Sequence, residues 1–576
     1  MTVKGNTQVV LENRGMVTLR PDDHKATGGE GSVYKVANTI IKIYLDPKKM
    51  IAADMVNKIR ALSTIKHDYI VSPRGVVTTP TGDPIGFYMD FADGEPLARV
   101  FTNAYRLRQG FTDDQASIVV ERMRDTLSFA HGQNAVLGDL NELNWLMLID
   151  SDKKPSPRII DVDSWAIGRW PVTAIMPSIR DWHTQGFNSL TDWFSWGIVT
   201  FQIYTGIHPY KGSLAGYKVG DFESRMKSNA SVFTPGIGLN QAVRDFSCVP
   251  TLLLEWYRSV FQEGERVAPP SPFDVSIKAP KAARIKKVVI TGVTGALIFD
   301  KLFGDPLDKV IRIFPCGVVM SESGKLIDLN TKKEIGRFDS RDCELIRVEG
   351  GWLKADLKDQ AEFTYIHSSD SKEERLDLAM NAYKIVRYEN RLFAVTDHGL
   401  TEVNMKMFGR PIMSVGNTWG AMLNSTAWFE GVGIQDTMGA MFLITPFNGD
   451  ACAHTRVHEL DGLRIITAKA GNRFVSIIAM DKNGLYKKIE LTFSADYSSY
   501  KSWVGATDSP DLNLAILPKG VCATVVNDGE LIIFVPTNGN IKKIQDKDAD
   551  TQMQLGNWDN KVVYIRDGSI WSLTMR

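Results

Sequence analysis

The second half of the chain, from residue 288 to residue 576, has a pattern that favours an all-β domain. Short runs of β-branched and aromatic residues alternate with turns rich in Gly, Asn and Asp, and the periodicity of amphipathic helices is absent. In RLFAVTDHGLTEVN (391–404) and KVVYIRDGSIWSLT (561–574), a strand, a glycine-containing turn and a second strand follow one another. The pattern therefore predicts a long series of β-hairpins.

The spacing of these hairpins predicts how they assemble. They recur at roughly forty to seventy residues, the interval expected for the blades of a β-propeller when one weak copy is missed. Six or seven four-stranded blades would fill residues 288–576, and a strand over Val288–Ile298 would pair with the last repeat to close the ring. A pair of β-sandwiches is the alternative. The segment contains no metal-binding or nucleophile motif, so we expect it to bind a substrate or a partner.

The composition argues against several classes of protein. With 576 residues the chain is too long for one hydrophobic core, so we expect a multidomain protein. Lys and Arg together number 67, as do Asp and Glu, and this balance leaves no basic excess for a nucleic-acid partner. The five cysteines form no CxxC pair, the N-terminus has no apolar signal core, and no run of about eighteen apolar residues occurs. We therefore expect a cytoplasmic protein that does not enter a membrane.

Two acidic loops lie close together in the segment 137–165. Asp139 is followed five residues later by Asn144, and then by two apolar strands of which the second ends in an Asp-Val-Asp sequence, Asp161 and Asp163. An Asp can orient a hydroxyl group or accept its proton, and an Asn with a carboxylate can hold a hard divalent cation. These are the residue types that phosphoryl transfer requires.

The spacing of these residues resembles that of the eukaryotic-like protein kinases, in which a catalytic loop Asp-x-x-x-x-Asn precedes a metal-binding Asp-Phe-Gly. The resemblance implies that Asp139 is the catalytic base and that Asn144 and Asp161 bind magnesium, with Asp163 as the other candidate for the acidic ligand. It also implies a bilobal α+β domain with ATP between its lobes. Further segments between residues 28 and 270 match the family in the same order.

A glycine cluster near the N-terminus is similar to the phosphate-binding loop of the kinases. The family pattern Gly-x-Gly-x-x-Gly-x-Val matches at Gly28, Gly31 and Val33, with Gly29 between them and an alanine at the first glycine. Glycines in such a turn let backbone amides point at a phosphate group. The resemblance implies that Lys42, in the Ile-Ile-Lys strand that follows, contacts the nucleotide phosphates.

The helix expected over residues 50–66 departs from the family. It carries Lys58 near the place of the glutamate that pairs with the strand lysine in kinases, and Asp54 is its only carboxylate. Either Asp54 substitutes for that glutamate one turn earlier, or the ion pair is absent. The departure bears directly on whether Lys42 can be held in an active position.

The sequence GFYMDFADGEPL resembles the strand and hinge at the back of the kinase nucleotide pocket. The resemblance places Met89 at the back of the pocket and Asp90, Phe91 and Ala92 in the hinge. Backbone amides and carbonyls of a hinge can bind an adenine edge without a special side chain.

The segments that follow residue 110 also match. A helix is expected over residues 112–131 from its apolar periodicity. LTDWFSWGIVTFQIYTGIHPYKG resembles a kinase helix whose Asp, here Asp192, holds the backbone of the catalytic loop, and Arg266 occupies the Arg position after the last helix. The segment 167–187 takes the place of the activation segment and lacks the family's Ala-Pro-Glu.

These matches predict five regions along the chain. They are an N-terminal tail (1–15), a mainly β N-lobe (16–95), a helical C-lobe (96–273), a basic linker (274–287) and a β-propeller-like domain (288–576).

The resemblance implies a kinase that uses ATP and magnesium, with manganese as the other possible metal, to phosphorylate Ser or Thr of a protein. The propeller would bind the substrate or a partner. Leu137 and Gly138 replace the family's His-Arg, Asn141 replaces a lysine, and Asp163 replaces a glycine. The alternative is therefore a pseudokinase scaffold that binds nucleotide or partners without catalysis.

Overall fold

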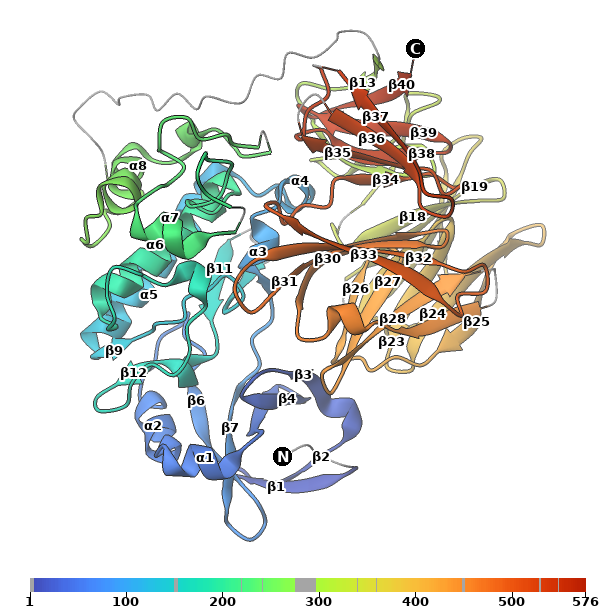
Figure 1. Ribbon diagram of the computed structural model, residues 1–576. Coiled ribbons are helices and arrows are strands. Elements are labelled where there is room, and N and C mark those ends of the chain that lie inside the picture. The colour runs from blue at the N-terminus through green and yellow to red at the C-terminus, as the bar shows by residue number, and fades with distance from the viewer. Residues whose placement is uncertain are drawn as a thin grey trace.

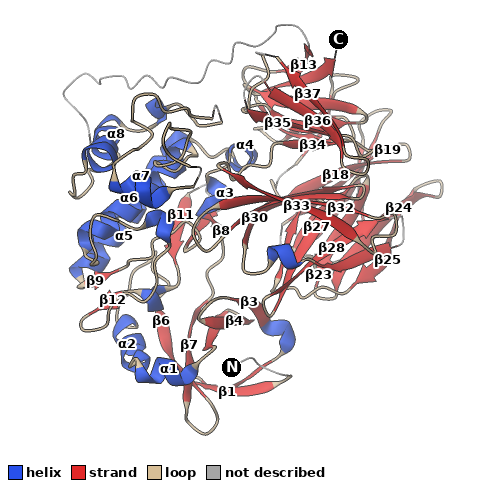
Figure 2. Ribbon diagram, in the orientation of Figure 1, coloured by secondary structure: helices blue, strands red, loops and turns tan. Residues whose placement is uncertain are grey.

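The computed structural model describes residues 5–149, 154–218, 220–240, 242–274, 297–338, 340–358, 360–447, 451–527, 530–546 and 548–575. Helices and strands are mixed up to residue 274, whereas the part from residue 297 consists almost entirely of strands (Figure 2). The basic linker expected at 274–287 lies outside the described residues except for Asp274.

Residues 7–90 contain a seven-stranded sheet in which every pair of neighbours is antiparallel, with the order β2-β1-β6-β7-β5-β4-β3. Its strands are β1 (Thr7–Leu11), β2 (Gly15–Leu19), β3 (His24–Thr27), β4 (Gly31–Val36), β5 (Thr39–Tyr44), β6 (Pro73–Thr78) and β7 (Pro84–Asp90). Part of the expected N-terminal tail is thus strand β1, which pairs with both β2 and β6.

Alternation along β5 buries apolar side chains on both faces of this sheet. Ile41 packs with Val9 and Val77 on one face, whereas Ile40 packs with Phe87 on the other. A strand with two buried faces has little freedom to shift, so the position of Lys42 between these residues is fixed by its neighbours.

The helix expected over residues 50–66 is two helices, α1 (Pro47–Ala52) and α2 (Met55–Leu62). They are separate because Asp54 has a left-handed backbone conformation, with a φ of 55°, which interrupts an α-helix. α2 buries Ile59 in the same cluster as Ile40 and so covers that face of the sheet.

The chain from residue 95 to residue 263 is mainly helical. Its longest helices are α5 (Asp113–Gly132) and α6 (Ser189–Thr205). α5 confirms the helix predicted at 112–131. It begins with a capping box in which the Oγ1 of Thr112 accepts the amide of Gln115 at 3.2 Å. α6 is buried from Thr191 to Thr205, which makes it the centre of this part.

Shorter elements complete this part around α5 and α6 (Figure 1). They are β8 (Glu95–Pro96), α3 (Leu97–Val100), α4 (Asn103–Gln109), β9 (Ala135–Val136), β10 (Trp145–Ile149), β11 (Pro155–Ile159), β12 (Ala166–Ile167), α7 (Phe222–Lys227) and α8 (Thr251–Arg258). The single helical turns of this part are η2 (Val162–Ser164), η3 (Pro177–Ile179) and η4 (Phe246–Cys248), and η5 (Ser259–Glu263) is a π-helical segment. A further turn, η1 (Pro21–Asp23), lies between β2 and β3 of the seven-stranded sheet.

Within the described residues, the part after residue 297 is built from seven four-stranded antiparallel sheets. The first three are β14 (Val310–Phe314), β15 (Val318–Ser321), β16 (Lys325–Asp328) and β17 (Glu334–Arg337); β18 (Cys343–Val348), β19 (Gly351–Leu357), β20 (Ala361–His367) and β21 (Glu373–Leu376); and β22 (Lys384–Tyr388), β23 (Arg391–Thr396), β24 (Gly399–Met407) and β25 (Pro411–Trp419).

Three further sheets follow in the same way, with one helical turn, η6 (His458–Leu460), between the first and the second. They are β26 (Thr426–Phe429), β27 (Val432–Thr437), β28 (Ala440–Phe447) and β29 (Ala451–Arg456); β30 (Arg464–Gly471), β31 (Phe474–Met480), β32 (Tyr486–Phe493) and β33 (Tyr500–Thr507); and β34 (Leu514–Ile516), β35 (Cys522–Asn527), β36 (Glu530–Val535) and β37 (Asn540–Gln545).

The seventh sheet joins the two ends of this part. β13 (Leu297–Gly304) pairs with β40 (Ser569–Met575), which continues through β39 (Lys561–Arg566) to β38 (Gln554–Trp558). The described part of the closing strand thus begins at Leu297, and residues 288–296 lie outside the described residues. The innermost strand of each of the seven sheets contributes residues to the wall of one central cavity, so the sheets surround it.

The sheets also contact the rest of the protein. α3 packs against β30, α4 against β14, and β3 against β27. A buried cluster joins Ala98 of α3 to Ile466, Ile478 and Tyr486 of the sheets. Among the described residues, no helix combines the length and the apolar character needed to cross a bilayer.

Candidate functional site

Lys42 on β5 is the centre of a cluster of charges. Its Nζ lies 2.9 Å from Oδ1 of Asp161 and 2.9 Å from Oδ2 of Asp163, with a carboxylate oxygen of Glu30 at 3.8 Å. Burial alone would lower the pKa of Lys42, but Asp161 and Asp163 outweigh it, so the pKa is raised and the side chain is a cation.

The two aspartates differ in their surroundings. Asp161 follows β11 and has a left-handed backbone conformation, with a φ of 62°, and its side chain is 41% exposed, whereas that of Asp163 is 1% exposed. The charge of Lys42 lowers the pKa of Asp161, and burial raises the pKa of Asp163. Asp161 is therefore the carboxylate that can offer oxygen to a ligand, while Asp163 is enclosed by Lys42 and the hydroxyl of Tyr44.

The loop of Asp139 and Asn144 lies directly beside the loop of Asp161. The amide of Ile160 donates to the carbonyl oxygen of Asn144 at 2.8 Å, which joins the two loops. The Nδ2 of Asn144 donates to the carbonyl oxygen of Asp139 at 2.9 Å. The structure therefore brings together Lys42, Asp139, Asn144 and Asp161, the four residues on which the sequence interpretation depends.

Asp192 of α6 holds the start of this loop through hydrogen bonds to its backbone. Its carboxylate accepts the amides of Leu137 and Gly138, each at 2.8 Å, and the Nε2 of His131 lies 2.9 Å from Oδ2. The side chain of Asp192 is completely buried in α6. Two backbone amides on one fixed carboxylate hold the start of the loop in place.

Asp139 itself has a second partner in the segment that follows Asp163. The amide of Met176 donates to its Oδ1 at 2.9 Å. Burial raises the pKa of Asp139, partly against the hydrogen bonds that it accepts. A carboxylate with a raised pKa is a suitable proton acceptor, although one of its oxygens is occupied by this amide.

The glycine cluster forms a tight turn at the start of β4. The amide of Gly28 donates to the carbonyl oxygen of Gly31 at 2.9 Å, and Gly29 is exposed at the tip. A Cβ at Gly31 would lie 2.8 Å from the carbonyl oxygen of Ile43, so only glycine fits there. Val33 lies opposite Lys42 in the β4–β5 register, which puts both side chains on the same face of the sheet.

The predicted hinge follows β7. Met89 and Ala92 are buried, and the carboxylate of Asp90 turns to Arg74, with which it forms an ion pair. The amide of Phe91 donates to the carbonyl oxygen of Asn38 at 3.0 Å. The Phe91 amide is thus already paired within the protein and does not face an adenine edge in this conformation.

Asp54 does not pair with Lys42, and so it does not replace the glutamate that pairs with the strand lysine in kinases. Its carboxylate pairs with Arg169, and the Nε1 of Trp170 donates to it at 3.2 Å. Instead, α2 places a second lysine, Lys58, near the acidic loops. Lys58 is 1% exposed and donates to the carbonyl oxygen of Pro171 at 3.2 Å. Burial lowers the pKa of Lys58 to about 8, against the attraction of Asp163. The sequence showed Lys58 only as a lysine near the place where kinases have a glutamate.

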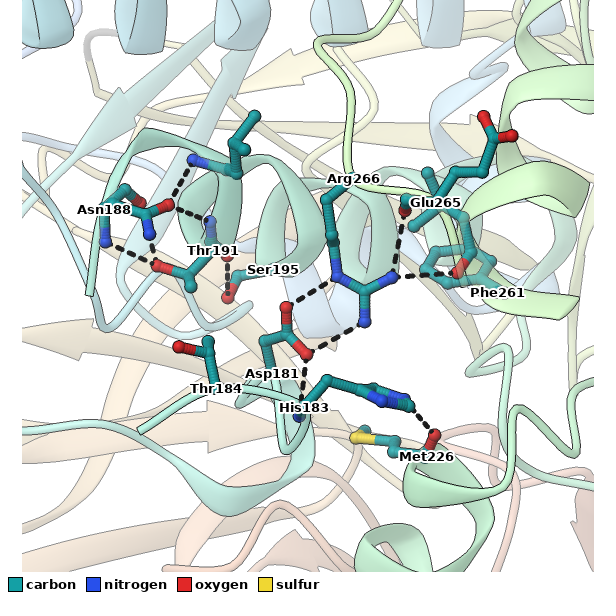
Figure 3. A network of polar contacts seen from close by, with 12 residues as sticks. Asp181, His183, Thr184, Asn188, Thr191, Ser195, Met226, Phe261, Glu265 and Arg266 are labelled. Carbon is teal, nitrogen blue, oxygen red and sulfur yellow. Dashed lines mark hydrogen bonds and ion pairs between the residues drawn. The ribbon is translucent and has the colours of Figure 1, made fainter. Parts of the chain in front are cut away.

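Arg266 lies away from these charges, at the base of α6 (Figure 3). Its guanidinium binds both carboxylate oxygens of Asp181, at 2.6 and 2.9 Å, and the amide of His183 donates to Asp181 Oδ1 at 3.1 Å. Nearby, the Oδ1 of Asn188 caps α6 by accepting two amides of its first turn. The ion pair of Asp181 and Arg266 connects the chain after η5 to the segment 167–187. The sequence analysis did not identify Asp181.

The sheets after residue 297 reach this site from the other side. The amide of Thr27, at the glycine turn, donates to Oδ2 of Asp436 at 3.1 Å. A Cβ on Gly28 would lie 3.7 Å from the Nη2 of Arg464, the first residue of β30. Within the described residues, no hydrogen bond or ion pair engages the Arg464 side chain. No local sequence pattern could predict that Asp436 and Arg464 lie beside the glycine turn, because they are more than 400 positions away along the chain.

The donor set around Asn144 and Asp161 suits a hard divalent cation. The Asn144 side chain donates from its Nδ2, and within the described residues no hydrogen bond engages its Oδ1, which can therefore act as a ligand. The half-exposed carboxylate of Asp161 lies in the adjoining loop. The described part of the chain has no cluster of three or more His, Cys, Asp or Glu that could hold a metal alone. Two protein ligands are what Mg²⁺ uses when phosphate and water complete its shell.

Comparison with known proteins relates part of the chain to a kinase. No family model matches the sequence. A stretch of 166 residues is 24% identical to the Developmentally-regulated protein kinase 1 of Dictyostelium discoideum, covering 27% of this chain and 22% of that protein. The match therefore leaves most of both proteins unaligned, and it indicates a kinase-like relationship for one part of this chain.

Proposed function

We propose that the chain is an ATP- and magnesium-dependent phosphotransferase of the protein-kinase type, whose two lobes are followed by a seven-bladed β-propeller. The observation that carries the proposal is the pairing of Lys42 with Asp161 at 2.9 Å beside the loop of Asp139 and Asn144. A phosphate-binding lysine, a metal-binding pair and a proton acceptor in one place are the parts that phosphoryl transfer needs.

Each residue has one role in the proposed reaction. Lys42 and the amides of the glycine turn would bind the phosphates of ATP, and Asn144 and Asp161 would hold the cation. Bound magnesium would neutralise charge that develops on the phosphates. Asp139 would orient the acceptor hydroxyl and take its proton, after Met176 has released the carboxylate oxygen that it occupies.

The sheets contribute to the proposed site in two ways. Arg464 places a positive charge beside the glycine turn, where phosphate groups would lie. Tyr486 donates to Glu142 of the catalytic loop at 3.4 Å, which couples β32 to the residues next to Asp139. We assign to the propeller a role in selecting the acceptor, a protein Ser or Thr, from this side of the site.

The test is transfer of labelled phosphate from ATP in the presence of Mg²⁺ or Mn²⁺, to the chain itself and to a generic protein substrate. Asp139→Asn and Asp161→Asn should each abolish transfer, and Asp161→Asn should also weaken nucleotide binding in the presence of the metal. Asp377→Asn, at an exposed site in the sheets, is the matched control. Transfer that survives in both site variants would overturn the assignment.

A pseudokinase is the second candidate, and two contacts favour it. The amide of Phe91 is paired with Asn38, and one oxygen of Asp139 is paired with the amide of Met176, so both an adenine contact and the base are engaged. In that case calorimetry would detect nucleotide binding without transfer under any metal condition. A mixed outcome, with binding lost in Asp161→Asn but no transfer in the intact chain, would select this alternative.

A further inference from the structure

The cavity at the centre of the seven sheets is a feature that the proposed function does not use. Its volume is about 780 Å³, and its wall includes residues of the innermost strand of every sheet. Residues of α3 and α4 close one side of it. Figure 1 shows these two helices between the other helices and the sheets. A volume of this size is typical of pockets for small molecules.

The wall of this cavity is charged and has more cations than anions. Seven Lys and Arg residues and five Asp and Glu residues line it. Glu344 is shared by Arg312 and Arg387, and Glu430 is shared by Arg387 and Lys469. Each of these two carboxylates therefore already neutralises more than one cation, and Glu95 pairs with Arg99. The wall is left with Arg108, Arg341 and Lys384 against Asp342 and Asp511.

Two of the remaining cations face each other across the junction of the two parts. Lys384, at the start of β22, donates only to the carbonyl oxygen of Trp428, at 2.9 Å, and Arg108 is at the end of α4. Within the described residues, neither of them forms an ion pair. Both lie close enough to Asp342 for their charges to lower its pKa, which burial nevertheless raises. Burial also lowers the pKa of Lys384, whereas Arg108 is exposed, and both residues line the cavity.

A bound anion would remove this imbalance. Buried charges are costly unless they are paired, and an excess of about two positive charges in an enclosed space attracts a negative group from solution. Metal ions do not suit the site because the cations of its wall outnumber the carboxylates. Double-stranded nucleic acid does not suit it because a cavity of about 780 Å³ has the size of a small-molecule pocket.

We propose that the cavity is a binding site for a small anion that carries phosphate or carboxylate groups, held by Lys384 of β22 and Arg108 of α4. Arg108 belongs to the helical part and Lys384 to the sheets, so the ligand would bridge them. Occupation of the cavity would then stabilise the packing of one part on the other, independently of whether the chain transfers phosphate.

The test is isothermal titration of the full chain with inorganic phosphate and with citrate, which separate the two kinds of anionic group. Arg108→Gln and Lys384→Gln should each weaken binding of at least one probe about tenfold. Lys519→Gln removes the same charge from an exposed turn of the sheets and should leave binding unchanged. Thermal unfolding without probe checks that each variant is folded, and Arg108, which is exposed and makes no side-chain hydrogen bond within the described residues, is the variant least able to disturb the fold.

Three results would overturn the proposal. They are the absence of binding of both probes by the intact chain, equal weakening in Lys519→Gln, and unchanged binding in both Arg108→Gln and Lys384→Gln. The last result would place the anion elsewhere, for example at the glycine turn. Failure of phosphate transfer has no bearing on this outcome, so the two proposals are tested separately.

Discussion

The ammonium group of Lys42 lies 2.9 Å from an oxygen of Asp163, a carboxylate that is 1% exposed. Asp161, the other acidic partner of Lys42, is 41% exposed at the same distance. The lysine is therefore shared between a structural carboxylate and one that is open to a ligand. Under the proposed function, Lys42 would contribute both to stability and to phosphate binding, and the two effects can be measured separately.

Lys42→Met should destabilise the protein by about 3–5 kcal/mol, because it removes the cation that forms an ion pair with the buried carboxylate of Asp163. Adding Asp163→Asn to this variant removes the uncompensated charge, so the double variant should recover a large part of the lost stability. Urea unfolding measures both effects. If the double variant is no more stable than Lys42→Met, then the ion pair is not the cause of the loss.

The contribution of Lys58 to stability should depend on pH, unlike that of a surface lysine whose pKa is the same in the folded and unfolded states. Burial lowers its pKa in the folded state to about 8, below the value of about 10.4 in an unfolded chain, so the folded state binds fewer protons between these values. Stability from this group therefore rises as pH increases from about 8 to about 10.

Lys58→Met should accordingly stabilise the protein at pH 7 by about 1–3 kcal/mol, and the gain over the unmodified chain should shrink toward pH 10. Urea unfolding of both chains across this range isolates Lys58 from the other titrating groups. A variant that is less stable at pH 7 would show that the contacts of Lys58 in the folded protein outweigh the cost of burying its charge.

Local patterns explain what the sequence could predict. The strands after residue 297 are separated by glycine turns, and the helix of Thr112 has its capping box within four residues, so both are visible in short windows. The pairing of Asp139 with Asn144 depends on a spacing of five residues within one loop. Such features need no knowledge of the rest of the fold.

Long-range relationships explain which features could not be predicted from the sequence. Asp54 interrupts a helix whose periodicity continues through it, because its backbone adopts a left-handed conformation that Asp tolerates but does not require. Asp181 and Arg266 are 85 positions apart, and Arg464 approaches Gly28 only because β30 packs on the other part of the chain. No spacing in the sequence identifies these pairs.

Asp181→Asn and Arg266→Ala should each cost about 3–5 kcal/mol, because each leaves a largely buried partner unpaired. In the intact chain, bonding to Arg266 more than offsets burial and lowers the pKa of Asp181, so its contribution to stability is present above about pH 4 and is lost on acidification. A double-mutant cycle by urea unfolding gives the coupling energy. A coupling close to zero would contradict the pair's structural role.

Arg464→Ala should weaken ATP binding roughly three- to tenfold while leaving the stability of the chain unchanged, because the guanidinium is exposed and forms no bond within the described residues. The loss follows from removing a charge that lies beside Gly28, where the phosphates would bind. Titration with ATP and Mg²⁺ measures the affinity, and Arg410→Ala, an exposed arginine at the end of the β24–β25 turn, is the control. Adenosine, which lacks phosphates, should bind both variants equally. Equal ATP affinities for the two variants would mean that the sheets contribute no charge to the nucleotide site.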